Sequence, residues 1–273
     1  MRVAVTGGSG KAGTAVVQEL IEHGHRVRNV DLVADPDSVA GYREANLDDF
    51  GQTIEALQGM DAVVHLAAVV RPGVTEEVTF RSNVGSTYNV FNAACILGLQ
   101  RVVWASSETT MGLPFDQTKP YFPVDEEQPT LAKSGYALSK VVGEEMARYF
   151  NSRYGMPFVG LRFSHVWDEG DYARQPTFQH DARIRSWNAW GYVDRRDVAQ
   201  ACRRAVEANT TGAEVFIVAA ADTVMERPNK ELLGEVFPHV EVRGELGDHG
   251  SLLSTEKARR VLGYEPRFSW RTS

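Results

Sequence analysis

The sequence has few cysteines, no long apolar run and no excess of positive charge. Its 273 residues include only Cys95 and Cys202, too few for a disulfide framework or a four-ligand zinc site. Apolar stretches such as 62–70 are far shorter than the roughly 18 residues of a membrane span. With 29 basic against 36 acidic residues, the net charge of −7 does not favour nucleic-acid binding. We therefore expect a small-molecule partner, without nucleic acid or membrane.

The N-terminal segment, MRVAVTGGSG, has one basic residue and neither the apolar region nor the cleavage-type site of a signal peptide. We therefore expect a cytoplasmic protein. A set of five histidines shows no metal-ligand spacing, and we expect no metal site. This set comprises His23, His25, His180, His239 and His249.

The sequence alternates short β-branched runs with longer segments of helical period, and no repeat or linker divides it. Such alternation favours right-handed parallel crossovers, and continuous apolar runs are typical of buried parallel strands. We predict an α/β fold, a Rossmann-type doubly wound parallel sheet with a small C-terminal substrate-binding subdomain. The predicted strands are 2–6, 27–31, 62–66, 101–105, 158–163 and 214–218, and the predicted helices are 14–22, 53–57, 83–97, 137–154 and 194–208.

A glycine-rich loop directly follows the first predicted strand and precedes the first helix. In GGSGKAG, residues 7, 10 and 13 have the TGxxGxxG spacing, and residues 8, 10 and 13 fit GxGxxG. Glycine permits a tight turn, close approach of the backbone to a pyrophosphate, and packing of helix on strand. The first helical turn then presents free N–H groups to the anion. We predict a dinucleotide site that includes Gly7, Gly10, Lys11, Ala12 and Gly13.

Asp31 ends the second predicted strand, 18 residues past Gly13. A carboxylate there can accept hydrogen bonds from both hydroxyls of the adenosine ribose and repels a 2′-phosphate, which favours NAD over NADP. Further along, Asn46 and Leu47 lie where an adenine edge could be held. Small residues at the end of the next strand leave room for a ring system. We include Leu66, Ala67 and Ala68 in the cofactor site.

Tyr136 and Lys140 are spaced so that a helix places both side chains on one face. Tyrosine has a reference pKa of about 10, and a neighbouring ammonium lowers that pKa by favouring the phenolate. The tyrosine then becomes a usable proton acceptor or donor. Ser106 and Ser107 follow the strand at 101–105, at the sheet edge that holds the cofactor. A hydroxyl there can hydrogen-bond a carbonyl oxygen that becomes an alkoxide.

These motifs, in this order, resemble the extended short-chain dehydrogenase/reductase superfamily, the NAD-dependent epimerase/dehydratase group. The resemblance covers nearly the whole chain. It rests on Asp31 and on TGGSGKAG, NLD, HLAA, NVGSTYNVFNAA, ASSETTMG, YALSK, LRFSHVW and GYVDRRDVAQA. It implies that Ser107 is catalytic, that Tyr136 is the general acid/base, and that Lys140 is its partner and a ligand of the nicotinamide ribose.

The resemblance also implies further partners and a domain organisation. Asn83 is at the position of a cofactor-site asparagine, with a helix-cap or helix-interior polar residue as the alternative. A homodimer would form through the helices that contain Asn83 and Ala137. We expect an NAD-binding Rossmann core with the catalytic residues at 1–163. An interleaved substrate-binding region would occupy 164–273, with 192–218 returning to the core.

Departures from the family's pattern narrow the expected activity. Glu108 and Thr109 stand where 4,6-dehydratases have an Asp-Glu pair, which disfavours dehydratase chemistry. Three further features look more like the branch of uronate dehydrogenases and related sugar or polyol dehydrogenases. They are TMG in place of the VYG of many epimerases, GVTEE after HLAAVVRP, and the short span 164–191.

The resemblance to this branch also implies which residues contact the substrate. Among Arg174, Arg183 and Arg185 we favour Arg183 as a guanidinium that recognises a substrate carboxylate or phosphate, with a surface arginine as the alternative. A packed core histidine is the alternative for His165, and a solvated carboxylate is the alternative for Glu108. The expected substrate-binding residues are Ser107, Glu108, Tyr136, His165 and Arg183.

The expected function is that of an NAD-dependent oxidoreductase acting on a secondary or anomeric hydroxyl of a small sugar, sugar acid or polyol. A sugar or nucleotide-sugar epimerase is the alternative, with the same three residues but with NADH retained. A non-catalytic dinucleotide-binding regulator is a further alternative. The presence of both Tyr136 and Lys140 argues against it, because a sensor needs no tuned acid/base.

Overall fold

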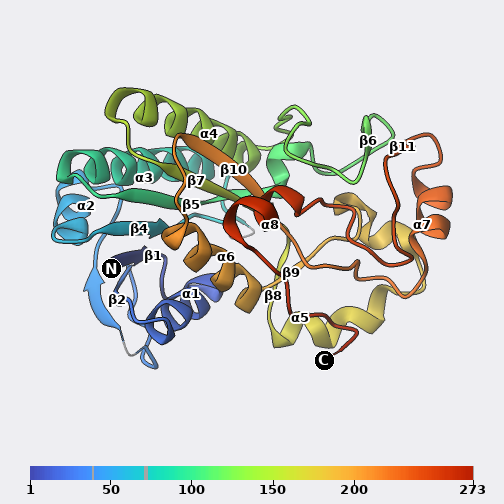
Figure 1. The fold of residues 1–273 in the computed structure, drawn as a ribbon, viewed down its shortest axis with the longest axis horizontal. Helices are drawn as coiled ribbons and strands as arrows, with labels where there is room; N and C mark the ends of the chain where they lie inside the picture. The colour runs from blue at the N-terminus through green and yellow to red at the C-terminus, as the bar shows by residue number, and fades with distance from the viewer. Residues whose placement is uncertain (39, 71–72, 273) are drawn as a thin grey trace.

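The computed structural model describes residues 1–38, 40–70 and 73–272, and its centre is a seven-stranded parallel sheet (Figure 1). The strand order is β10-β7-β5-β4-β1-β2-β3. From β1 the chain adds β2 and β3 on one side, and it then returns to add β4 and the later strands on the other side. Doubly wound folds bind nucleotides at this switch between β1 and β4. The bounds are β1 Arg2–Thr6, β2 Arg26–Asp31, β3 Gly41–Glu44, β4 Ala62–His65, β5 Arg101–Ser107, β7 Phe158–Phe163 and β10 Ala213–Val218.

The central strands β4 and β7 are buried along their whole length, as expected for parallel strands covered on both faces. β3 was not predicted. It lies at the sheet edge, all four of its residues are exposed, and its sequence GYRE contains no apolar run. Its backbone pairs with β2 from Arg28 to Asp31, so the strand exists because of its neighbour rather than because of its own hydrophobic pattern.

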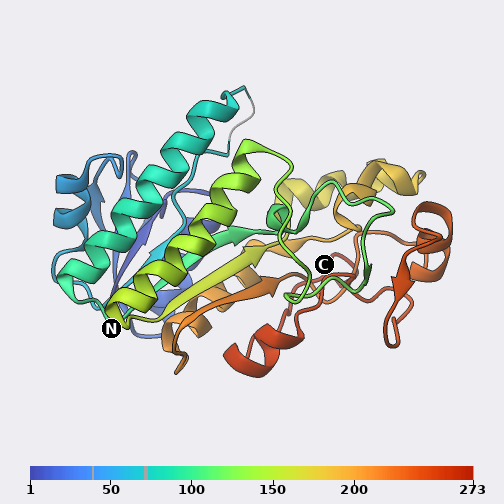
Figure 2. The same ribbon diagram turned by 90° about the horizontal axis from the view of Figure 1, so that it is seen from above.

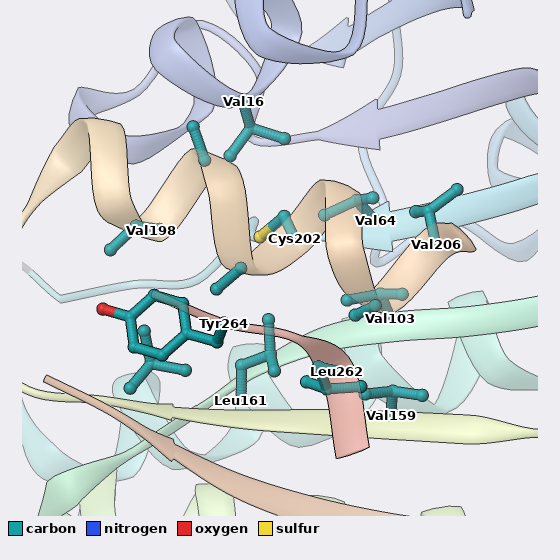
Figure 3. Packing of buried hydrophobic residues seen from close by; sticks show 14 of the residues in the cluster. Val16, Val64, Val103, Val159, Leu161, Val198, Cys202, Val206, Leu262 and Tyr264 are labelled. Carbon is teal, nitrogen blue, oxygen red and sulfur yellow. The ribbon is translucent and has the colours of Figure 1, made fainter. Parts of the chain in front are cut away.

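Helices cover both faces of the sheet in two layers. α2 (Phe50–Leu57), α3 (Glu76–Leu97) and α4 (Gly135–Tyr154) pack on one face. α3 and α4 lie side by side over most of their length (Figure 2). On the other face, α1 (Lys11–Glu22), α6 (Arg195–Glu207) and α8 (Glu256–Leu262) share a second core. Cys202 lies at the centre of that core, between Val16 of α1 and the valines of the strands (Figure 3).

α3 begins at Glu76 rather than at the predicted Asn83. The Thr75 side chain caps the helix by accepting from the backbone N–H of Val78. Glu76 and Glu77 place negative charge in the first turn, where the helix dipole favours it. The prediction was based on the apolar pattern, which begins later in the helix. Capping and charge extend the helix toward its N-terminus, beyond the residues that bury an apolar face.

A third cluster of buried side chains forms a smaller body beyond the carboxyl end of the sheet, on the right in Figure 1. Its largest side chains include Trp167, Trp190 and Phe237, and it also takes Met111 and Phe122 from the segment between β5 and α4. The elements are η1 (Glu108–Met111), β6 (Tyr121–Phe122), β8 (Val166–Trp167), α5 (Glu169–Arg174), η2 (Gln175–Phe178), η3 (Ala182–Asn188), β9 (Val193–Asp194), α7 (Asn229–Val236) and β11 (Glu241–Val242).

None of the helices within the described ranges combines the length and apolarity that crossing a membrane requires. The same ranges hold no group of three or more His, Cys, Asp or Glu side chains placed to bind a metal ion.

Candidate active site

The glycine loop folds so tightly that two of its positions accept only glycine. Gly7 has a φ of +67°, and a Cβ there would lie 2.7 Å from the backbone nitrogen of Ala67. A Cβ on Gly13 would lie 2.1 Å from the carbonyl oxygen of Gly7. Gly10 is the N-cap residue of α1 and has no side chain that could cap the helix. No capping side chain therefore bonds the first-turn N–H groups, which include those of Lys11 and Ala12. This open helix start is a suitable site for a pyrophosphate.

Asp31 contacts this loop directly. Its Oδ2 accepts from the backbone N–H of Ser9 at 3.1 Å, which brings the end of β2 to the glycine turn. At the same sheet edge, after β3, Leu47 is buried and Asn46 is exposed. This placement of a carboxylate beside the pyrophosphate cradle fits the adenosine ribose of NAD.

The loop after β4 is held from two sides. The backbone N–H of Leu66 donates to the carbonyl oxygen of Thr6 at 3.0 Å, and Ala67 and Ala68 are partly buried beside the glycine loop. The Asn83 amide accepts from the N–H of Val69 at 2.7 Å and donates to the Val69 carbonyl at 3.1 Å. Asn83 is therefore a buried residue of the α3 interior that positions this loop.

The Lys11 side chain points away from the glycine loop. Its Nζ bonds Asp171 Oδ2 at 2.5 Å and lies 3.0 Å from Asp168 Oδ2, the two carboxylates of the α5 capping box. The side chain thus joins the start of α1 to the start of α5. Only the backbone of Lys11 remains directed to a phosphate in the first turn of α1.

Ser106 and Ser107 have different environments. Ser106 Oγ donates to Glu144 Oε1 at 2.7 Å, and Arg162 forms a fork to the same carboxylate with two bonds of 2.8 Å. This network is buried and structural. Ser107 Oγ instead accepts from the backbone N–H of Thr109 at 3.2 Å and from the Thr109 hydroxyl at 3.0 Å, and it lies close enough to Tyr136 to lower the pKa of that tyrosine. The structure therefore brings Ser107, not Ser106, to the tyrosine.

Lys140 lies one helical turn beyond Tyr136 on α4. Its Nζ is 5.6 Å from the centre of the Tyr136 ring and donates to the Ala105 carbonyl at 2.8 Å. The helix begins at Gly135 because Ser134 caps it by accepting from the N–H of Ala137 at 3.1 Å. Ser107, Tyr136 and Lys140 therefore come together at the carboxyl edge of the sheet.

The tyrosine's proton affinity differs from the expectation. The pKa of Tyr136 is raised to about 12, mainly by burial and also by the charge of Glu108. Ser107 lowers this pKa, but by less than burial raises it. Burial also lowers the pKa of Lys140 to about 8. Burial therefore outweighs the expected lowering of the tyrosine pKa in this structure, in which the Lys140 ammonium is bonded to the Ala105 carbonyl.

Glu108 follows Ser107 and is buried, so it is not the solvated carboxylate of the alternative. Its Oε2 accepts from Ser164 Oγ at 2.6 Å, and its Oε1 accepts from Asn188 Nδ2 at 3.1 Å. Burial raises the pKa of Glu108 to about 7, against these two hydrogen bonds, which lower it. Ser164 and Asn188 were not predicted, because nothing in their local sequence marks them.

Arg183 and Arg185 of η3 lie in different environments. The Arg183 side chain is 65% exposed and pairs with Glu235 of α7 at 2.6 Å. Arg185 is only 8% exposed, and its Nη1 lies 3.2 Å from Nδ1 of His165. Two residues on η3 thus have opposite placements, because the turn directs Arg183 outward and Arg185 into the smaller body. Arg185, and not Arg183, lies beside the predicted substrate residue His165.

The model of the NAD dependent epimerase/dehydratase family matches residues 3–219. The chain belongs to that family. The predicted α/β fold, enzyme class and nicotinamide cofactor NAD are confirmed at the level of this family, and so is the resemblance on which they rested.

Curated relatives include dehydrogenases of more than one substrate class. L-arabinose 1-dehydrogenase (NAD(P)(+)) of Haloferax volcanii is 32% identical over 76% of this chain and 83% of its own length. A 3-beta-hydroxysteroid dehydrogenase of Mycolicibacterium neoaurum is 27% identical over 98% of this chain and 88% of its own. Uronate dehydrogenase of Pseudomonas syringae pv. tomato is 28% identical over 62% of this chain and 60% of its own.

Solved structures with this fold include both a dehydrogenase and an epimerase. A mutated uronate dehydrogenase has a TM-score of 0.72 at 22% identity and is matched over 99% of this chain and 83% of that chain. UDP-N-acetylglucosamine 4-epimerase from Bacillus cereus has a TM-score of 0.74 at 20% identity. The match covers 100% of this chain and 95% of that chain. At these identities the likeness concerns the fold.

Proposed function

We propose that this protein is an NAD-dependent dehydrogenase that oxidises a secondary or anomeric hydroxyl of a small sugar, sugar acid or polyol. The contact between Ser107 and Tyr136, with Lys140 on the next helical turn, carries the proposal. The three residues lie at the sheet edge where the glycine loop forms its cradle. The similarity to L-arabinose 1-dehydrogenase and uronate dehydrogenase supports a sugar-like substrate.

In the proposed reaction, the substrate hydroxyl bonds to Tyr136 Oη and Ser107 Oγ. Tyr136 in its phenolate form takes the hydroxyl proton, and Ser107 stabilises the oxygen as the carbonyl forms. Bound NAD supplies the acceptor for the hydride that leaves the same carbon. Lys140 holds a proton close to the tyrosine and, with Tyr136, orients the nicotinamide ribose. Glycines 7, 10 and 13 and Asp31 hold the pyrophosphate and the adenosine ribose.

The direct test is absorbance at 340 nm with purified protein, excess NAD or NADP, and a panel of aldoses, uronates, polyols and nucleotide sugars. We expect NADH to accumulate beyond the amount of enzyme with at least one aldose, uronate or polyol. NAD should be preferred, because Asp31 would repel the 2′-phosphate of NADP. Failure of the whole panel to reduce either cofactor would contradict the proposal.

A sugar epimerase is the second candidate, favoured by the fold shared with UDP-N-acetylglucosamine 4-epimerase. An epimerase would use the same three residues and return the hydride to the opposite face of the carbon. It would release no NADH during turnover, so conversion of a sugar to its epimer without absorbance at 340 nm would support this candidate instead.

We also propose that the protein is a cytoplasmic homodimer paired through α3 and α4. These helices expose large apolar or aromatic side chains: Tyr88, Ile96, Leu138, Tyr149 and Tyr154. Burial of such a surface against a second copy would stabilise a dimer. Light scattering should give twice the 30.2 kDa mass of one chain, and Tyr149→Glu with Tyr154→Glu should halve that mass. A monomeric wild-type mass at micromolar concentration would refute the pairing.

A further inference from the structure

The His165 ring receives two hydrogen bonds at the same nitrogen. Trp167 Nε1 lies 3.1 Å from His165 Nδ1, and Arg185 Nη1 lies 3.2 Å from the same atom. An indole N–H and a guanidinium can only donate hydrogen bonds. Nδ1 must therefore act as the acceptor, which places the proton of the neutral ring on Nε2.

Both donors are held rigidly by the smaller body. The second nitrogen of the Arg185 fork, Nη2, donates to the Gly191 carbonyl at 3.0 Å, and the guanidinium lies 4.7 Å from the centre of the Trp187 ring. The Trp167 ring is buried and meets the imidazole edge-on at a centroid distance of 6.5 Å. The Nη1 and Nη2 atoms of Arg185 are therefore directed inward, and both have protein partners.

The backbone of His165 lies next to the candidate active site. The backbone N–H of His165 lies close enough to the carboxylate of Glu108 to lower its pKa, and Glu108 directly follows Ser107 in the chain. Ser164, the preceding residue, donates to the same carboxylate. His165 is a solvent-exposed residue even though its ring contacts Trp167 and Trp187, so it is not the packed core histidine of the alternative. With Nδ1 occupied, Nε2–H is the polar group that the ring can offer to a ligand.

We propose that Arg185 and Trp167 are positioning residues that hold His165 as a neutral Nε2–H donor to an oxygen atom of the substrate. This inference rests on the proposed dehydrogenase function, since it assigns a role within that substrate site. A fixed tautomer means that the ring can bind a hydroxyl, ring or carbonyl oxygen but cannot accept from a substrate N–H or O–H at Nε2.

The charges around the ring keep this donor neutral. Desolvation and the positive charge of Arg185 lower the pKa of His165 to about 4, and the negative charge of Asp171 opposes them. Because the pKa is lowered, the neutral form persists from about pH 5 upward. The charged groups that face His165 are Arg185 of η3, Asp171 and Arg174 of α5, Lys11 of α1 and Glu108 of η1.

The test compares Arg185→Met, Arg185→Gln and the matched control Arg183→Met, which removes an exposed arginine from the same short helix. Arg185→Met should raise KM about tenfold with kcat nearly unchanged, because the ring loses its fixed orientation. Arg185→Gln, which keeps an N–H donor, should recover part of the loss. The control should behave as wild type.

Nitrogen-15 NMR of the imidazoles reports the tautomer without any turnover. The His165 signals, assigned by their loss in His165→Asn, should show a protonated Nε2 and an unprotonated Nδ1 in the wild-type protein between pH 6 and 8. A protonated Nδ1, or an unchanged KM in folded Arg185→Met, would overturn the inference. If no substrate is ever found, the proposed function fails, while the NMR result still decides the tautomer.

Discussion

Tyr136→Phe should lower kcat/KM by about 10²- to 10⁴-fold, the usual contribution of a general acid/base. The substitution removes only the hydroxyl, and the ring keeps its place beneath Lys140 Nζ. Chemistry should therefore fail while the protein still binds NAD, which fluorescence quenching would measure. Steady-state formation of NADH with the best substrate of the panel is the measurement.

The pH dependence of the wild-type reaction gives a second readout of Tyr136. Its pKa of about 12 lies above the working range, so the fraction of phenolate grows as pH rises. Oxidation of the substrate should accelerate from pH 7 to pH 9, and Tyr136→Phe should lose this slope. Tyr149→Phe is the control, because Tyr149 is an exposed tyrosine of the same helix. Near wild-type turnover in Tyr136→Phe would disprove the proposed mechanism.

Glu144→Ala should destabilise the protein by about 3–5 kcal/mol, the usual cost of leaving one partner of a buried ion pair alone. Glu144 accepts both bonds of the Arg162 fork and the hydroxyl of Ser106, and all three side chains are buried. The carboxylate joins α4 to β5 and β7 directly behind the catalytic edge. Urea unfolding followed by circular dichroism would measure the loss.

The adjacent residue provides a matched control for this prediction. Glu145 pairs with Arg148 on the exposed side of α4, where solvent screens the charges. Glu145→Ala should change the free energy of unfolding by about 1 kcal/mol or less. Equal effects of the two substitutions would show that the buried network contributes no more than a surface pair, contrary to our expectation.

The cofactor loop was predictable because its constraints are local. The atoms that exclude a Cβ at Gly13 belong to Gly7 and Gly8, a few residues away in the chain. The Tyr136 and Lys140 spacing is also local, since one helical turn places both side chains on one face. Apolar runs likewise identified most strands of the sheet, because a strand buried on both faces must be apolar along its length.

The details of the active site depended on residues that are far apart in the sequence. Arg185 was passed over for Arg183, because only the folded η3 directs one guanidinium to His165 and the other to Glu235. Glu108 is bonded by Asn188, 80 positions further along the chain. No local pattern signals such a contact.

From the amino-acid sequence alone, the doubly wound α/β fold could be inferred from the hydrophobic period, and the nicotinamide cofactor from the glycine loop and Asp31. The family and the three candidate catalytic residues followed from the resemblance of short motifs to that family. The pKa of Tyr136, the inward fork of Arg185 and the network of Glu144 were decided by three-dimensional packing. The physical reason is that burial and charge sum over neighbours from many segments, and those neighbours are known only once the chain is folded.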